Sequence, residues 1–171
     1  MTEYFNTRTF TLVPAEISSP QEQERIIRSQ FDLSVNDIVR SVELQQYGAR
    51  LVFSSNYTDE NSVPRVAVEG SFPAIYKYIL GLDRINDFNK AVLGFDALSK
   101  ICFIAIAEGS KLVISNSYRS ADFNSAMYFL LEALRQRQIN PAQTSADIYG
   151  EISDLKLHII QGILKNIRVF K

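Results

Sequence analysis

The feature that most constrains this sequence is a run of seven apolar residues, 101–107 (ICFIAIA). A strand with one solvated face alternates apolar and polar residues, whereas a strand covered on both faces is apolar throughout. The run therefore predicts a central strand that is covered on both faces. Residues 108–110 (EGS) follow as a turn, and 112–115 (LVIS) read as a second apolar strand, so the two segments together predict a hairpin.

Helices and strands alternate after this hairpin. The expected elements are a helix over 122–138, a strand over 146–149, a helix over 154–165 and a strand over 167–170. On the last helix, Leu155, Ile159 and Ile163 repeat every four residues and are expected to face inward. Strands that are joined through helices pair in parallel by right-handed crossovers, so the second half predicts an α/β layer.

The first half mixes helix and strand signals. The expected strands are 9–13, 38–44, 50–53 and 65–68, and the expected helices are 19–31, 72–80 and 85–93. Ile85, Phe88 and Val92 give the third helix its spacing. No linker rich in Pro, Gly or Ser separates the halves. We therefore expect a reduced N-terminal α+β lobe over 1–95 and a C-terminal α/β lobe over 96–171, or one continuous domain.

Charge and hydropathy exclude several classes of protein. The chain has 171 residues and a formal net charge of -1, so no basic surface points to nucleic acid. No apolar run approaches the roughly 20 residues of a membrane span. The N-terminus lacks the basic start and apolar core of a signal peptide. We therefore expect a cytoplasmic protein that neither binds nucleic acid nor inserts into a membrane.

Residues with catalytic or metal-binding chemistry are scarce. The single cysteine, Cys102, lies in the central apolar run, and the single histidine, His158, shares the polar face of the last helix with Asp154. One cysteine and one histidine cannot build a zinc site or a Cys–His nucleophile pair within one chain. No glycine loop of the Walker or dinucleotide type occurs. The sequence therefore assigns no catalytic residue and no metal ligand, and it favours a protein that is not an enzyme.

Two stretches carry a resemblance to a known family. One is 111–118 (KLVISNSY) with the helix that follows it and 148–152 (IYGEI); the other is 10–14 (FTLVP), which also precedes a helix. Together they resemble an uncharacterised bacterial family, a domain of unknown function with an actin-like ATPase fold. The resemblance runs from about Phe10 to Phe170. It implies an actin-like, ribonuclease-H-like second lobe with a central hairpin followed by β-α-β-α-β elements.

The resemblance also implies where a nucleotide would bind. In such a fold, a hairpin turn with an acidic residue, a spacer and a glycine meets the phosphates and the metal ion. Gly109 and Ser110 match this turn, but Ala107 stands where the acidic residue belongs. The adenosine turn of such folds carries two adjacent glycines, and here Gly150 is followed by Glu151. Gly109, Ser110 and Gly150 are therefore expected to be remnants of a nucleotide site.

These observations predict a non-catalytic cytoplasmic scaffold or protein-interaction module, a pseudo-ATPase with a degenerate actin-like fold and no cofactor. The alternative is an atypical nucleotide-binding protein or ATPase that binds ATP–magnesium between the lobes. The last strand, Ile167 to Phe170, is expected at the edge of its sheet, where it offers unpaired backbone groups to a protein partner or a second copy. The competing interpretation is that Arg168 and Lys171 merely guard this edge against pairing.

Overall fold

The computed structural model describes all residues, 1–171. They form two compact units, Met1–Tyr76 and Lys77–Lys171. Helix α2 (Ala74–Gly81) begins in the first unit and ends in the second. The boundary expected near residue 95 differs from this division, because β8 (Asn89–Asp96) is the middle strand of the sheet in the second unit.

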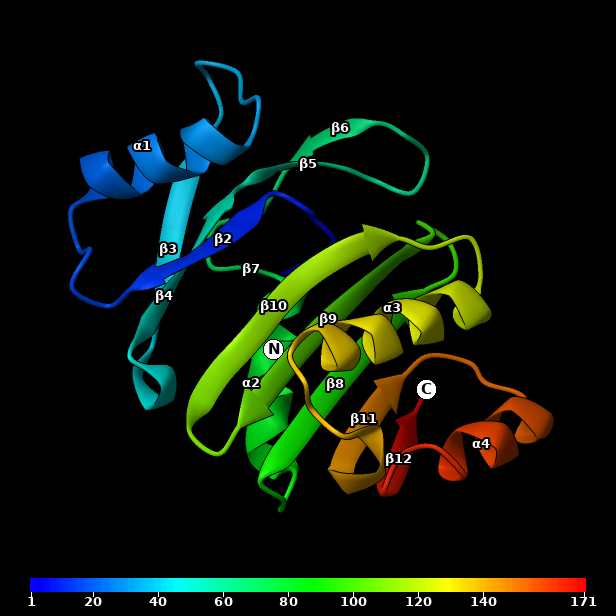
Figure 1. Ribbon diagram of the computed structural model, residues 1–171. Helices are drawn as coiled ribbons and strands as arrows, with labels where there is room; N and C mark the ends of the chain where they lie inside the picture. Colours follow the sequence, from blue (N-terminus) through cyan, green and yellow to red (C-terminus); the bar gives the residue numbers. More distant parts are fainter. The chain divides into compact units, whose positions relative to one another are not determined.

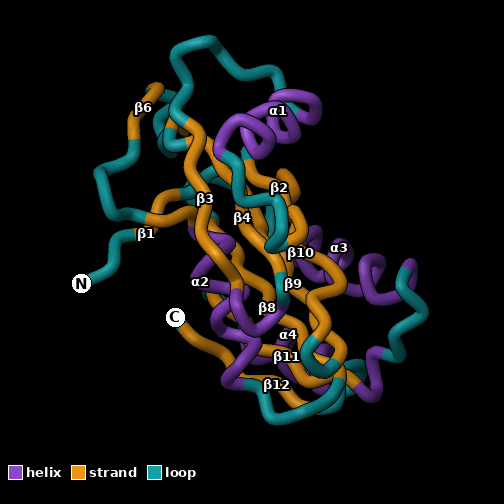
Figure 2. Tube along the Cα trace, turned by 90° about the vertical axis from the view of Figure 1, so that its left-hand side faces the viewer, coloured by secondary structure: helices purple, strands orange, loops and turns teal.

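The first unit contains a three-stranded antiparallel sheet and one helix. Its strands lie in the order β2 (Phe10–Pro14), β4 (Ala49–Ser54) and β3 (Val39–Leu44). Helix α1 (Pro20–Gln30), which the sequence predicts, lies across one face of this sheet (Figure 2) and is capped by the side chain of Ser19. Ile27 packs there with Val13 and Val52 in a small core.

Shorter elements complete the first unit. They are the parallel pair β1 (Tyr4–Phe5) and β7 (Phe72–Pro73), the antiparallel pair β5 (Asn56–Thr58) and β6 (Pro64–Val66), and the 3₁₀ turn η1 (Gln45–Tyr47). Gly48 follows η1 with a left-handed φ of 59°, which glycine adopts at little cost. It therefore lets the chain turn from β3 into β4.

The second unit contains a five-stranded mixed sheet. The strand order is β10 (Lys111–Arg119), β9 (Ile101–Glu108), β8, β11 (Thr144–Tyr149) and β12 (Asn166–Phe170). β8, β11 and β12 are parallel to one another, whereas β9 runs antiparallel to both β8 and β10. The central hairpin and the position of the last strand at the sheet edge are therefore as the sequence predicts.

Helices cover both faces of this sheet. α3 (Phe123–Gln136) and α4 (Asp154–Gln161) lie on one face and α2 on the other (Figures 1 and 2). The core under α3 and α4 includes Leu93, Cys102, Ile104, Ile106, Leu130, Leu134 and Ile148, none more than 1% exposed. The longest helix, α3, has 14 residues, and no helix combines the length and hydrophobicity of a membrane span.

The helix expected over 85–93 does not form. The short 3₁₀ turn η2 (Leu82–Arg84) ends before this segment, and β8 occupies its second half. Residues 91–93 are each 0% exposed, because β8 lies between β9 and β11 and both its faces are covered. Phe88, which the helical spacing would have buried, is 65% exposed. Strand pairing on both sides has therefore overridden the local pattern.

α4 presents a different face to the core from the one expected. Ile160 and Leu164 are 4% and 3% exposed and pack in the core beneath α3 and α4. Leu155, Ile159 and Ile163, which were expected to face inward, are 72%, 55% and 36% exposed. The segment carries two apolar stripes one residue apart, and the stripe that contains Ile160 is the buried one.

Two adjacent isoleucines test this orientation. Ile159→Asp is expected to change the free energy of unfolding by no more than about 0.5 kcal/mol, because its side chain already meets water. Ile160→Asp is expected to cost more than about 3 kcal/mol, because it removes core packing and buries a carboxyl group. Urea unfolding followed by circular dichroism measures both. Equal destabilisation by the two variants would show that α4 is rotated from this placement.

Candidate functional site

The carboxyl ends of the parallel strands β8, β11 and β12 lie together at one end of the sheet, which we call the carboxyl edge. They end at Asp96, Tyr149 and Phe170, respectively. Open α/β sheets bind their ligands at the carboxyl ends of parallel strands, where the loops that follow the strands come together. This edge is therefore the first candidate site in the second unit.

The turn from β8 to β9 is closed by its own acidic residue. The carboxylate of Asp96 accepts a hydrogen bond from the amide of Leu98 at 3.0 Å and another from the hydroxyl of Ser99 at 2.8 Å. The turn, 97–100 (ALSK), contains no glycine. Asp96 was not predicted as a site residue, because the segment around it was expected to be a boundary between lobes. The sequence feature that could have identified Asp96 is an acidic residue close after a run of apolar residues.

Gly150 lies beside this turn, after β11. Its φ is +141°, and its amide donates a hydrogen bond to the carbonyl of Phe170 at 2.8 Å. A Cβ atom at this position would lie 3.1 Å from the carbonyl oxygen of Phe95. The close approach of β8 and the bond to β12 therefore account for this glycine. Gly150 and Asp96 are thus brought together at one edge.

Gly109 and Ser110 lie at the other end of the sheet. Glu108 pairs with Asn89 at the start of β8, whereas Gly150 follows the pairing of Tyr149 with Gly94 near its end. At about 3.3 Å per residue, the turn after β9 and the turn after β11 are roughly 20 Å apart. The structure therefore does not bring Gly109 and Gly150 together around one ligand.

The turn at Gly109 has a structural role within the fold. Gly109 has a left-handed φ of +58°, and its amide donates to the carbonyl of Phe88 at 2.8 Å. The ring of Phe88 lies 2.9 Å from the position of a Cβ on Gly109, so the ring covers this turn. Ser110 is exposed. A role for either residue in nucleotide binding stays a prediction.

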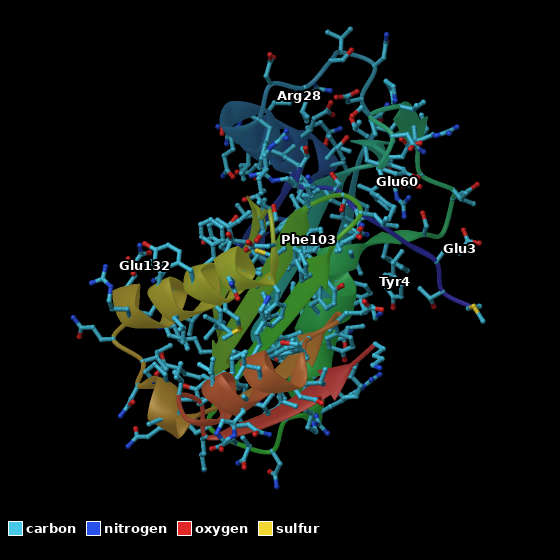
Figure 3. All side chains as sticks on the ribbon, turned by 90° about the vertical axis from the view of Figure 1, so that its right-hand side faces the viewer. Glu3, Tyr4, Arg28, Glu60, Phe103 and Glu132 are labelled. Atoms are coloured by element: carbon cyan, nitrogen blue, oxygen red, sulfur yellow. The ribbon has the colours of Figure 1, made fainter.

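An aromatic layer covers the sheet next to the carboxyl edge, on the face of α2. The ring of Tyr78 lies directly over Gly94 and 5.8 Å from that of Phe103, which Figure 3 labels within the sheet. Burial, with smaller effects of Asp96 and Tyr149, raises the pKa of Tyr78 to about 12. The phenol is therefore neutral at physiological pH, and its ring occupies the face of the sheet beside Asp96.

The layer continues onto the edge strand. The rings of Tyr149 and Phe170 stack at 4.8 Å between centroids, and the ammonium of Lys77 lies 5.2 Å from the ring centroid of Tyr149. Stacked pairs and cation–π contacts of this kind contribute to stability as well as to ligand binding. Here the rings contact each other, so they serve the packing of β11 against β12.

The residues singled out for metal or nucleophile chemistry are dispersed. Cys102 is buried in β9, and His158 is exposed on α4. No group of three or more His, Cys, Asp or Glu side chains lies close enough together to hold a metal ion.

An apolar groove runs between α3 and α4. It has a volume of about 290 Å³ and is lined by Phe123, Met127, Tyr128, Leu131, Ile159 and Ile163. Tyr128 is 63% exposed at its rim. This groove was not predicted from the sequence, because Ile159 and Ile163 were expected to face the core.

Comparisons with known proteins agree with the fold. The family described as "Protein of unknown function (DUF3822)" matches residues 4–168. A crystal structure from Bacteroides thetaiotaomicron VPI-5482, described as a protein with actin-like ATPase fold and unknown function, matches with a TM-score of 0.70 at 16% sequence identity. The match covers 96% of this chain and 66% of that protein, so this chain spans just under two thirds of its length. No curated protein matches the sequence. The likeness shows an actin-like α/β fold, as the sequence resemblance implies.

Proposed function

Because this chain belongs to the DUF3822 family of proteins of unknown function, we propose that it is a non-catalytic protein-interaction module, a scaffold built on an actin-like fold. The observation that carries the proposal is that the groups a nucleotide would need at the carboxyl edge are engaged within the fold. The carboxylate of Asp96 closes its own turn, the amide of Gly150 bonds to β12, and Tyr78 covers the sheet beside them.

The edge strand β12 supports an interaction role. It is the last strand in the sheet order, so one of its sides has no strand neighbour. Of the two residues that would guard this edge, Arg168 is directed onto the sheet face, where its guanidinium binds Asp147. An extended segment of a partner, or β12 of a second copy, is the ligand that such an edge accepts through main-chain hydrogen bonds. The exposed side chains of Leu155 and Ile159 on α4 add apolar surface to the same unit.

A second candidate function is nucleotide binding at an atypical site. One observation favours it: Asp96 and Gly150 are neighbours at the carboxyl ends of β8 and β11, where α/β sheets bind ligands. In this case the hydrogen bonds that close the turn at Asp96 would have to open before the carboxylate could meet a magnesium ion. The interaction module requires no such rearrangement.

A thermal-shift titration separates the two functions. We expect ATP with magnesium to raise the melting temperature of the chain no more than inorganic phosphate does at the same concentration, which is the control for anion effects. A ligand present at 100 times its dissociation constant adds about 2.7 kcal/mol to the free energy of unfolding, which a melting curve resolves. A saturable increase that requires both ATP and magnesium would support the nucleotide-binding function instead.

A further inference from the structure

We propose that the second unit carries a binding site for a phosphate-class oxyanion, in a pocket at the amino ends of β11 and β12. The pocket has a volume of about 230 Å³, and Ile85 and Ala146 form part of its lining. Its polar lining residues are Arg84, Asn86, Ser145, Asp147, Asn166 and Arg168. It lies at the opposite end of the parallel strands from Asp96 and Gly150. The inference is therefore independent of the proposed interaction role and of the question of ATP binding.

The first element of the site is a guanidinium held in a fixed orientation. Asp147 on β11 has a side chain only 2% exposed, and its two oxygens accept hydrogen bonds from Arg168 Nε at 2.8 Å and Nη2 at 2.7 Å. Nη2 of Arg168 also donates to the carbonyl of Arg84 at 3.0 Å. These three hydrogen bonds fix the orientation of the planar guanidinium. Its remaining nitrogen, Nη1, keeps two N–H donors for a ligand.

The acidic groups around the pocket are already neutralised. Asp147 is bound by Arg168, and the neighbouring Asp87 accepts hydrogen bonds at 2.8 Å from Lys165 and at 2.9 Å from the hydroxyl of Ser145. The hydrogen bond from Lys165 is the main cause that lowers the pKa of Asp87, followed by the bond from Ser145. Both carboxylates are therefore compensated by a cation of their own.

The donors that remain are not matched by acceptors. Arg84 is exposed at the end of η2, forms no ion pair, and brings a second positive charge to the pocket. The side-chain amide of Asn86 is exposed beside it and has no partner within the chain. With two arginines and one carboxylate, the lining residues carry a formal excess of one positive charge. Such a pocket favours an anion that accepts several hydrogen bonds.

The size and the arrangement of the donors indicate the class of anion. A volume of 230 Å³ is below the roughly 300–1,000 Å³ of sites that enclose a drug-sized ligand, so the pocket suits an anionic group rather than a whole cofactor. The donors come from three segments: η2, the segment after it, and β12. A tetrahedral phosphate presents oxygens in several directions at once, whereas a planar carboxylate offers two oxygens that a single arginine satisfies.

The test is a titration of the full chain with sodium phosphate at constant ionic strength, followed by NMR of the arginine Nε–H and backbone amide signals. We expect saturable shifts of Arg84, Asn86 and Arg168 with a dissociation constant of about 1 mM. Glycerol 3-phosphate is titrated in parallel: tighter binding than phosphate identifies a phosphomonoester, and weaker binding identifies free phosphate. Acetate is expected to bind at least tenfold more weakly than either.

Arg84→Ala is expected to weaken phosphate binding at least tenfold without changing the melting temperature, because the side chain makes no ion pair. The matched control is Arg119→Ala, which removes an exposed arginine of β10 and is expected to leave binding unchanged. The proposal is overturned if no saturable shift occurs up to about 50 mM phosphate, a concentration that would occupy most of a site with the expected affinity. Equal weakening by the two variants, or equal affinity for acetate, would overturn it as well.

Discussion

Gly94→Ala is expected to destabilise the chain by about 3 kcal/mol or more, as overpacking does where neither partner can move away. An added Cβ would lie 2.1 Å from the ring of Tyr78. The backbone fixes the position of this Cβ, so the new methyl group cannot turn away from the ring. The ring itself is held by Phe103 at 5.8 Å and Tyr149 at 5.4 Å between centroids. The substitution must therefore displace α2 from the sheet or distort β8.

Two comparisons isolate this contact in urea unfolding measurements. Gly48→Ala meets no atom within 4 Å and carries only the cost of a left-handed backbone, about 1–2 kcal/mol. In Tyr78→Ala the ring is absent, so the additional change Gly94→Ala is expected to cost less than about 1 kcal/mol. If Gly94→Ala were no more costly than Gly48→Ala, Tyr78 would not lie over Gly94.

Arg168→Ala is expected to lower the melting temperature by roughly 10 °C or more, because it leaves the carboxylate of Asp147 buried without a cation. That carboxylate is 2% exposed and takes both of its charged hydrogen bonds from Arg168. The desolvation of Asp147 is compensated only while this pair is intact. Removing one partner of a buried pair is therefore much more damaging than replacing both.

The control variants distinguish this pair from an ordinary surface pair. Arg135→Ala breaks the pair with Glu132, in which the arginine side chain is 72% exposed, and is expected to lower the melting temperature by no more than about 2 °C. The double variant Asp147→Leu, Arg168→Met is expected to recover most of the stability that Arg168→Ala loses. If Arg168→Ala lowered the melting temperature no more than Arg135→Ala does, the carboxylate of Asp147 would be accessible to solvent.

Much of the second unit follows from local sequence signals. The unbroken apolar run at 101–107 predicts a strand covered on both faces, and β9 is such a strand. Asp122 predicts the start of α3, and its carboxylate accepts a hydrogen bond from the amide of Ser125 at 2.8 Å. These signals succeed because caps and continuous apolar runs depend on few neighbours.

The failures occur where two patterns compete within one segment. Ile85, Phe88 and Val92 have helical spacing. Residues 91–93, however, are buried in β8, which has strand neighbours on both sides. In α4, either apolar stripe could face inward by periodicity alone, and packing against α3 selects Ile160. Tertiary contacts that the sequence does not display decide both cases.

The candidate site was predictable in kind but only partly in position. Gly150 lies at the carboxyl end of a parallel strand, where a ligand-binding turn belongs. Gly109 does not, because the strand before it runs antiparallel and ends at the opposite edge. The neighbour of Gly150 is Asp96, which could not be recognised while the segment before it was assigned to a helix.

The most direct test of the central claim is an NMR titration of the labelled chain with ATP and magnesium, observing the amides of Leu98, Ser99 and Gly150. An actin-like fold whose carboxyl edge is occupied by its own hydrogen bonds predicts no saturable shift at these three amides, whatever occurs at Arg84 and Asn86 in the anion pocket. Saturable, magnesium-dependent shifts at Leu98, Ser99 and Gly150 would contradict the account and assign a working nucleotide site to this edge.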